Sequence, residues 1–228
     1  MATSHLFHYS REKTVKMIRT EAIVFNAFQV NTYLVWDESG DCLVIDPAFY
    51  SREEQEALIS IIHKKGLTIK GQLNTHCHVD HILGVDFMKT EFGCPVRAHR
   101  EELKIITNAP LMGDLFGWSV EPIDGIDEFL LENNDIHLGK HLLKTLHVPG
   151  HSPGSVALYS KEGGFVITGD ALFQGSIGRT DLPGGDYDTL IKSIREKLLT
   201  LPPETLVFPG HGPSSTIGHE RDENPYLK

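Results

Sequence analysis

The chain has 228 residues, of which 40% are hydrophobic and 23% charged, the composition of an ordinary globular protein. Its formal net charge of −10 disfavours non-specific binding to nucleic-acid phosphates and to anionic membranes. No apolar run is long enough to cross a bilayer, so we expect neither a nucleic-acid partner nor a membrane partner.

The first segment, Met1–Lys16, is interpreted as a polar N-terminal extension, because it lacks the apolar core of a secretory signal. The chain has three cysteines and no Cys-x-x-Cys pair, which argues against a disulfide framework and favours a reducing, cytoplasmic location. Residues 17–228 contain no repeat, low-complexity tract or linker, so we expect a single domain over this range.

The first predicted elements are strands. They are expected at Ile18–Phe25, Thr32–Trp36 and Cys42–Ile45, with a hairpin turn at Asp37–Asp41. Ser51 and Glu54 have the spacing of a capping box, so the sequence predicts a helix that starts at this point and ends before Gly66.

Strands and helices alternate in the remainder of the chain. Further strands are predicted at Ile69–Asn74, Pro95–Ala98, Leu142–His147, Ser155–Tyr159, Phe165–Thr168 and Thr205–Phe208. Helices are predicted at Leu83–Phe92, at Arg100–Phe116 in two pieces broken at Pro110, and at Tyr187–Leu199. Early hairpins followed by alternating strands and helices favour a mixed sheet system flanked by helices.

Four of the predicted apolar strands end directly before histidine or aspartate. The strand near Ile69 leads into the segment Asn74–His81, and the later strands lead into His151, Asp170 and His211, each directly after a glycine. In α/β architectures, ligands bind at the carboxyl ends of strands. Glycine lets the backbone turn tightly there and bring the next side chain into a crowded site.

These strand ends supply seven candidate metal ligands: His76, His78, Asp80, His81, His151, Asp170 and His211. Imidazole and carboxylate groups together suit zinc and iron. Alternation along an extended segment sends His76, His78 and Asp80 to one side, whereas His81 can face a second metal. Seven ligands exceed one tetrahedral site, so the sequence predicts two divalent ions that share a carboxylate. Zinc is the first expectation, and iron and manganese are compatible.

The run His-x-His-x-Asp-His at residues 76–81, followed by the later histidines and aspartate, resembles the metallo-β-lactamase superfamily. Residues 173–181 and 209–213 resemble, more narrowly, the short glyoxalase II-like hydrolases. The resemblance covers the chain from about Met17 onward and implies a four-layer αββα sandwich with the metals at one edge of the paired sheets. It places His76, His78 and His151 on the first metal and Asp80, His81 and His211 on the second, with Asp170 bridging both.

This resemblance implies that the substrate is a small acyl-thiol and that the reaction is thioester hydrolysis, as with hydroxyacyl-glutathione. A hydroxide held between the metals is the expected nucleophile, oriented by Asp80 and Asp170 as the catalytic residues. Full-length glyoxalase II also carries a C-terminal helical domain that helps to hold glutathione. The present chain ends about seventeen residues after His211, so we expect little preference for glutathione itself. The sequence gives no indication of the oligomeric state.

Two other function classes remain open. A persulfide dioxygenase with one iron resembles the chain at Gly178–Asp181 and uses the equivalents of His76, His151 and Asp170. The third class is a metal-binding scaffold without catalysis.

Three residues near the predicted ligands allow more than one interpretation. Arg179 could bind an anionic substrate or could brace its loop through Asp181 or Asp186. Cys77 lies between two predicted ligands, but alternation along the segment points it away from the metals, as a packed thiol. His99 follows a predicted strand and could either reach the site or pack in the core.

Overall fold

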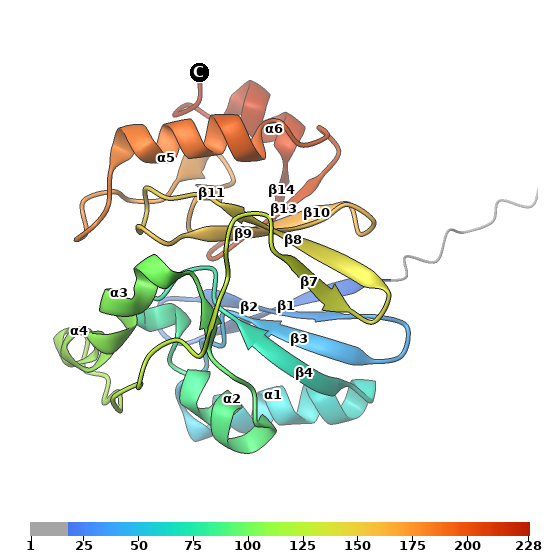
Figure 1. The fold of residues 1–228 in the computed structure, drawn as a ribbon, viewed down its shortest axis with the longest axis vertical. Helices are drawn as coiled ribbons and strands as arrows, with labels where there is room; N and C mark the ends of the chain where they lie inside the picture. The colour runs from blue at the N-terminus through green and yellow to red at the C-terminus, as the bar shows by residue number, and fades with distance from the viewer. Residues whose placement is uncertain (1–17) are drawn as a thin grey trace, which may run out of the picture.

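Two large β-sheets pack face to face at the centre of the structure, with helices on both outer faces (Figure 1). The structure is a computed structural model that describes residues 18–228, so the expected extension Met1–Lys16 lies outside the described residues. The covering helices are α1 (Arg52–Lys65) and α2 (Val85–Phe92) on the first sheet, and α5 (Tyr187–Ser193) and α6 (Ile217–Glu223) on the second. This arrangement confirms the predicted αββα sandwich.

The first sheet has the strand order β1-β2-β3-β4. Its strands are β1 (Arg19–Phe25), β2 (Val30–Trp36), β3 (Asp41–Ile45) and β4 (Thr68–Leu73). The first three are antiparallel neighbours, whereas β4 runs parallel to β3 because helix α1 forms the crossover between them.

The second sheet has the order β14-β13-β10-β9-β8-β7. Its strands are β7 (Asp135–Leu138), β8 (His141–His147), β9 (Val156–Ser160), β10 (Phe165–Gly169), β13 (Leu206–Pro209) and β14 (Ser215–Thr216). Strands β10 and β13 are parallel, with α5 in the connection between them. The predicted strands of both sheets are therefore confirmed, whereas β7, β14 and α6 were not predicted.

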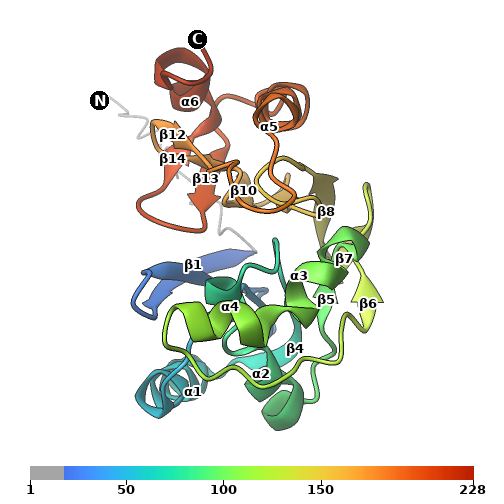
Figure 2. The same ribbon diagram turned by 90° about the vertical axis from the view of Figure 1, so that its left-hand side faces the viewer.

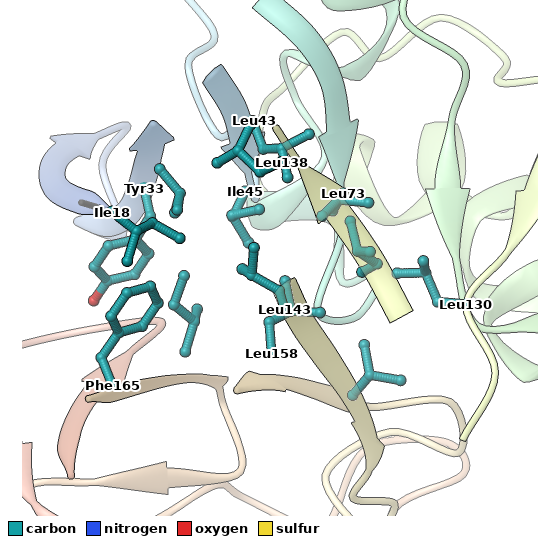
Figure 3. Packing of buried hydrophobic residues seen from close by; sticks show 14 residues of the cluster. Ile18, Tyr33, Leu43, Ile45, Leu73, Leu130, Leu138, Leu143, Leu158 and Phe165 are labelled. Carbon is teal, nitrogen blue, oxygen red and sulfur yellow. The ribbon is translucent and has the colours of Figure 1, made fainter. Parts of the chain in front are cut away.

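The main core lies between the two sheets, as Figure 3 shows. Leu43, Ile45 and Leu73 from the first sheet face Leu143 and Leu158 from the second, and all five side chains are at most 2% exposed. Removing this apolar surface from water stabilises the sandwich. The core thereby fixes the positions of the loops that leave both sheets.

Helix α1 begins with the predicted capping box. The Ser51 hydroxyl accepts a hydrogen bond from the Glu54 backbone N–H, and the Glu54 carboxylate accepts one from the Ser51 backbone N–H. Gly66 ends the helix in the left-handed region at φ 64°. No helix of the described residues is both long enough and apolar enough to span a bilayer.

The helical segment after β5 is divided at a different residue from the one predicted. It consists of η2 (Arg100–Glu102), α3 (Leu103–Thr107) and α4 (Ala109–Leu115). The break lies at Asn108, and Pro110 lies in the first turn of α4, where its missing N–H has no helical partner to lose. Figure 2 shows α3 and α4 in front of the two sheets, on the side that is left in Figure 1.

Short elements complete the description. They are β5 (Arg97–Ala98) paired with β6 (Glu128–Phe129), β11 (Leu172–Phe173) paired with β12 (Ser176–Ile177), the single turn η1 (Val79–His81), and the π-helical turn η3 (Ile194–Leu198) that extends α5. The predicted helix Tyr187–Leu199 thus consists of α5 and η3.

A buried histidine, His141, connects the two sheets at the end of the sandwich where the β2–β3 and β9–β10 turns lie. His141 Nδ1 lies 2.6 Å from a Glu162 carboxylate oxygen and His141 Nε2 lies 2.8 Å from one of Glu38, while the imidazole is only 1% exposed. Glu38 belongs to the β2–β3 turn of the first sheet and Glu162 to the β9–β10 turn of the second. Hydrogen bonds to Glu162 and Glu38 raise the pKa of His141.

Replacing His141 with glutamine is expected to destabilise the protein more at pH 6 than at pH 9. Because the pKa of His141 is raised in the folded state, the imidazolium contribution is fully present below the unfolded pKa of about 6.5 and is lost as pH rises through the folded value. Urea denaturation of both proteins at the two pH values measures this difference. An equal loss of stability at both values would mean that His141 acts through packing alone.

Candidate metal centre

All seven predicted ligand residues lie together where strands of both sheets end. His76 and His78 lie in the loop after β4, and Asp80 and His81 lie in η1, directly after that loop. The other three follow β8, β10 and β13 of the second sheet, as His151, Asp170 and His211 respectively. These side chains therefore gather at the strand ends where the sequence predicted them.

Three histidines form the first group of potential ligands. His78 Nδ1 lies 2.9 Å from His151 Nε2, and His151 Nε2 lies 3.3 Å from His76 Nε2. Two nitrogens bound to one tetrahedral zinc at about 2.0–2.1 Å lie roughly 3.3 Å apart. The ligand atoms of His76, His78 and His151 all lie within 4.8 Å of one another, which suits a single cation.

Asp80, His81 and His211 form the second group, again with ligand atoms within 4.8 Å of one another. His81 Nε2 lies 3.2 Å from His211 Nε2, which in turn lies 3.4 Å from Asp80 Oδ2. This group can hold a second cation with one carboxylate and two imidazoles.

Asp170 lies between the two groups. Its Oδ2 is 3.6 Å from His151 Nε2 and 3.4 Å from His211 Nε2, and its Oδ1 is 3.5 Å from His81 Nε2. Oδ1 is buried and has no hydrogen-bond partner among the described residues. A buried carboxylate oxygen without a donor is costly unless a cation binds it. The donor set therefore fits two divalent cations that share Asp170.

The histidine pKa values of the two groups are shifted in opposite directions. Burial lowers the pKa of His76 and of His151 and lowers that of His78 to about 4, which leaves these imidazoles neutral, as metal ligands must be. Burial also acts to lower the pKa of His211, but its hydrogen bonds to Asp170 and Asp80 outweigh this and raise the pKa to about 9.

The loop that carries His211 is fixed by strand β2 and the preceding hairpin. The Asn31 backbone N–H donates to the Gly210 carbonyl at 2.7 Å, and the Tyr33 hydroxyl donates to the Pro209 carbonyl at 2.7 Å. His211 Nδ1 lies 2.9 Å from the Phe28 carbonyl oxygen, so its Nε2 faces the other ligands.

Asp46, which is not among the predicted site residues, orients His81. Its buried carboxylate accepts hydrogen bonds from the Thr75 N–H and the Thr75 hydroxyl, both at 2.7 Å, and lies 3.1 Å from His81 Nδ1. These contacts leave His81 Nε2 directed at Asp80 and His211, the other members of the second group. Asp46 directly follows β3, so its position at a strand end is the sequence signal by which it could have been predicted.

Glu102 connects the two loops that carry the first group. Its buried carboxylate accepts hydrogen bonds from the Cys77 N–H, the Ser152 hydroxyl and the Gly154 N–H, each at 2.7 Å. Cys77 lies between His76 and His78, and Ser152 directly follows His151. No sequence signal predicted this role, because Glu102 lies in a helical segment where glutamate is usually exposed.

Replacing Glu102 with alanine is expected to weaken binding at the first group by roughly 10–100-fold, the usual cost of losing a residue that supports metal ligands. The second group contacts other residues and is expected to keep its affinity. Competition with a chelator, measured for each cation, tests this difference. As a matched control, Glu101→Ala removes an exposed carboxylate from the neighbouring position. Equal weakening at both groups would contradict a role specific to the first.

The structure shows the positions of Cys77, His99 and Arg179, for which the sequence allowed more than one interpretation. Cys77 is fully buried in an apolar cluster, as predicted for a packed thiol. His99 stacks on His147 with ring centroids 4.1 Å apart, and it joins neither ligand group. The Arg179 guanidinium pairs with Asp181 at 2.7 and 2.8 Å, which is one of the two bracing contacts considered.

Arg179 also contributes through its backbone, because its carbonyl oxygen lies 2.8 Å from His151 Nδ1. This contact directs His151 Nε2 to the ligand groups. Asp186, the other bracing candidate, instead accepts a hydrogen bond from the Thr189 N–H at the start of α5. Binding of an anionic substrate by the exposed Arg179 side chain stays a prediction.

A cavity of about 340 Å³ opens onto the ligand atoms and is walled on one side by Phe28 and Phe116. These rings are in edge-to-face contact, with centroids 5.1 Å apart. His78, Asp170 and His211 all line this cavity, so a small molecule bound in it would contact both ligand groups.

Comparison with known proteins agrees with this geometry. Residues 25–211 match the family model described as the metallo-beta-lactamase superfamily. The protein named "Probable metallo-hydrolase YqgX" of Bacillus subtilis is 42% identical over 87% of this chain and 92% of its own length. The hydroxyacylglutathione hydrolase GloC of Haemophilus influenzae is 39% identical over 91% of this chain and 97% of its own.

Solved structures are similar over nearly the whole chain. The BLEG-1 B3 metallo-beta-lactamase has a TM-score of 0.84 and 36% identity, and the similarity covers 92% of this chain and 100% of that one. The protein TTHA1623, solved in a di-iron-bound form, has a TM-score of 0.81 and 38% identity, with 91% and 100% covered.

Proposed function

Since the chain belongs to the metallo-beta-lactamase superfamily, whose members include metal-dependent hydrolases, we propose that it hydrolyses thioesters with two divalent cations at this centre. The observation that carries the proposal is the position of Asp170 between two complete ligand groups, with a buried oxygen that lacks a hydrogen-bond donor. Zinc is the first candidate for both positions, and the di-iron form of TTHA1623 supports iron as the second.

The ligand residues have distinct roles in this proposal. His76, His78 and His151 would hold the first cation and Asp80, His81 and His211 the second, with Asp170 able to serve both. When bound, such cations polarise a carbonyl group and make water a stronger nucleophile. The carboxylates of Asp80 and Asp170 border the same cavity and orient the attacking water.

In the reaction, water adds to the thioester carbonyl carbon and the carbon–sulfur bond breaks. The products are a carboxylic acid and a thiol, whose sulfur takes up the proton from water. No enzyme nucleophile is needed. Ser152 directly follows His151, but its hydroxyl is buried and hydrogen-bonded to Glu102 at 2.7 Å, which removes it as a candidate nucleophile.

Thioesters are favoured over other acyl compounds by the likeness to GloC, which is named as a hydroxyacylglutathione hydrolase. A reducing cytoplasm fits a reaction that releases a thiol, and all three cysteines of the chain are free and buried. We place the protein there as part of the same proposal.

A substrate panel tests the proposed function. Protein reconstituted with zinc or iron is assayed with acyl-thiols that include a hydroxyacyl-glutathione, with a β-lactam, with a phosphodiester, and with glutathione persulfide under oxygen-uptake recording. Thioester cleavage at the highest kcat/KM is the expected result. Oxygen consumption with the persulfide would favour the dioxygenase interpretation. Inactivity on the whole panel would favour a scaffold.

Fully loaded protein is expected to contain two cations per chain, because the two ligand groups share no residue and each offers three ligand atoms. Elemental analysis after reconstitution and removal of free metal measures this ratio. A ratio of one cation per chain, even with excess metal present during reconstitution, would contradict the dinuclear centre.

A further inference from the structure

The cavity at the ligand groups lies between two larger cavities. On one side it shares His78, Ile105, Met112 and Leu182 with a cavity of about 620 Å³, here called the α3–α4 lobe. On the other side it shares His151, Asp170, Arg179 and His211 with a cavity of about 480 Å³. The two outer cavities have no lining residue in common, so they adjoin different parts of the cavity at the ligand groups.

This arrangement matches the shape of a thioester. Two arms, the acyl chain and the thiol carrier, leave the reacting carbonyl carbon in different directions. A carbonyl group at the cations therefore directs one arm into the α3–α4 lobe and the other into the opposite cavity. Each outer cavity is within the size range of sites that bind a small organic molecule.

The walls of the α3–α4 lobe are largely apolar. Leu103 and Ile105 of α3 and Met112 of α4 line one side, and Leu182 and Pro183 line the other. A polar arm bound here would lose its hydrogen bonds to water without gaining enough new ones, whereas an apolar arm gains by burial.

Two positively charged side chains, those of Arg100 and Lys104, lie at the rim of the same lobe. Arg100 and Lys104 both line it, and within residues 18–228 neither takes part in an ion pair. The Arg100 guanidinium lies 6.0 Å from the Phe129 ring, and the rim carries one carboxylate, that of Glu101. Free basic groups beside an apolar cavity are notable in a chain of net charge −10. They favour an anionic group at the outer end of a bound arm.

We propose that the α3–α4 lobe binds one arm of the thioester, an apolar chain that ends in an anionic group held by Arg100 and Lys104. This inference rests on the proposed thioester hydrolysis and makes its substrate class narrower. At about 620 Å³ the lobe has far more volume than a lactoyl group can fill. Glutathione, a tripeptide with two carboxylates and an ammonium group, leaves the apolar walls without a matching partner.

Two homologous series of thioesters test the lobe and identify the arm. One lengthens the acyl chain from acetyl to octanoyl on a constant thiol, and the other lengthens the thiol chain on a constant acetyl group. Each is prepared with and without a terminal carboxylate. Burial of each added methylene is expected to raise kcat/KM about fourfold until the lobe is filled, in one series only.

Variants separate the charge from the apolar wall. The double variant Arg100→Gln with Lys104→Gln is expected to lower kcat/KM about tenfold for the carboxylate-ended substrates and less than about twofold for the neutral ones. Leu103→Trp, which fills the lobe from its half-exposed wall, is expected to shorten the longest chain accepted. Lys64→Gln, an exposed lysine on α1, is the matched control and should change neither.

The outcomes separate this inference from the proposed function. If short and long thioesters are hydrolysed equally well in both series, the lobe proposal is overturned and thioester hydrolysis stands. If no thioester is hydrolysed, titration calorimetry of zinc-loaded protein with the matching thioethers decides the lobe alone. Thioether affinity that rises with chain length and falls in the double variant supports it, and affinity independent of both overturns it.

Discussion

His151→Ala is expected to remove mainly the first cation and His211→Ala mainly the second, while hydrolysis falls by at least about 10²-fold in both variants. His151 Nε2 lies 2.9 and 3.3 Å from the ligand nitrogens of His78 and His76, whereas His211 Nε2 lies 3.2 Å from His81 Nε2. Because the proposed reaction uses both cations, for activation of water and for polarisation of the carbonyl group, loss of either one is expected to stop efficient turnover. Elemental analysis and kcat measured on the same samples test both statements.

The control for this pair is His63→Ala, which removes an exposed histidine of α1 that belongs to neither ligand group. It should retain both cations and full activity. Full activity in His211→Ala with one cation bound would contradict the shared mechanism and would favour a one-metal reaction, including the dioxygenase interpretation.

Gly210→Ala is expected to abolish binding of the second cation and to lower activity by about 10²-fold, although all seven ligands remain. A Cβ atom at Gly210 would lie 2.1 Å from Asp170 Oδ1 and 2.8 Å from His81 Cε1. The backbone cannot retreat easily, because the Gly210 N–H donates to the Gly169 carbonyl and its carbonyl accepts from Asn31. The carboxylate and the imidazole must therefore move. Metal titration and kcat measure the result.

Gly212→Ala is the matched control, two residues further along the same loop. Gly212 has a φ of 74°, but a Cβ atom there would meet nothing within 4 Å. Its cost is therefore backbone strain alone, about 1–2 kcal/mol of stability, with both cations retained. Loss of the cation in both variants would mean that the loop conformation matters and that the contact with Asp170 does not.

Local rules predicted most of the helices and strands, and they predicted the strand ends at which the candidate ligands gather. The capping box at Ser51 and Glu54 formed as expected, and the ligand residues follow β4, β8, β10 and β13. These predictions succeeded because hydrogen-bonding geometry and strand alternation act over a few residues. The ligands meet because parallel strands end at a common edge, which the alternation of elements already indicates.

Features that depend on distant contacts were not predictable. Glu102 is buried by contacts with Cys77 and Gly154, which lie 25 and 52 residues away along the chain. Strand β14 has two residues and exists only through its pairing with β13, and helix α6 has only seven. No short window of sequence carries enough pattern to identify such elements. The predicted break at Pro110 is wrong, because proline is tolerated in the first turn of a helix, and the break lies at Asn108.

The ligand groups draw on both halves of the sandwich. His76 and His78 leave the first sheet, whereas His151 leaves the second, so a cation held by all three is a cross-link between the sheets. A cation held by all three histidines would therefore bind only the docked state, in which the two sheets are packed together. By mass action, free metal at a thousandfold excess over its Kd adds about 4 kcal/mol to the docked state. A chelator should therefore act on this protein as a mild denaturant whose first target is the contact between its two halves.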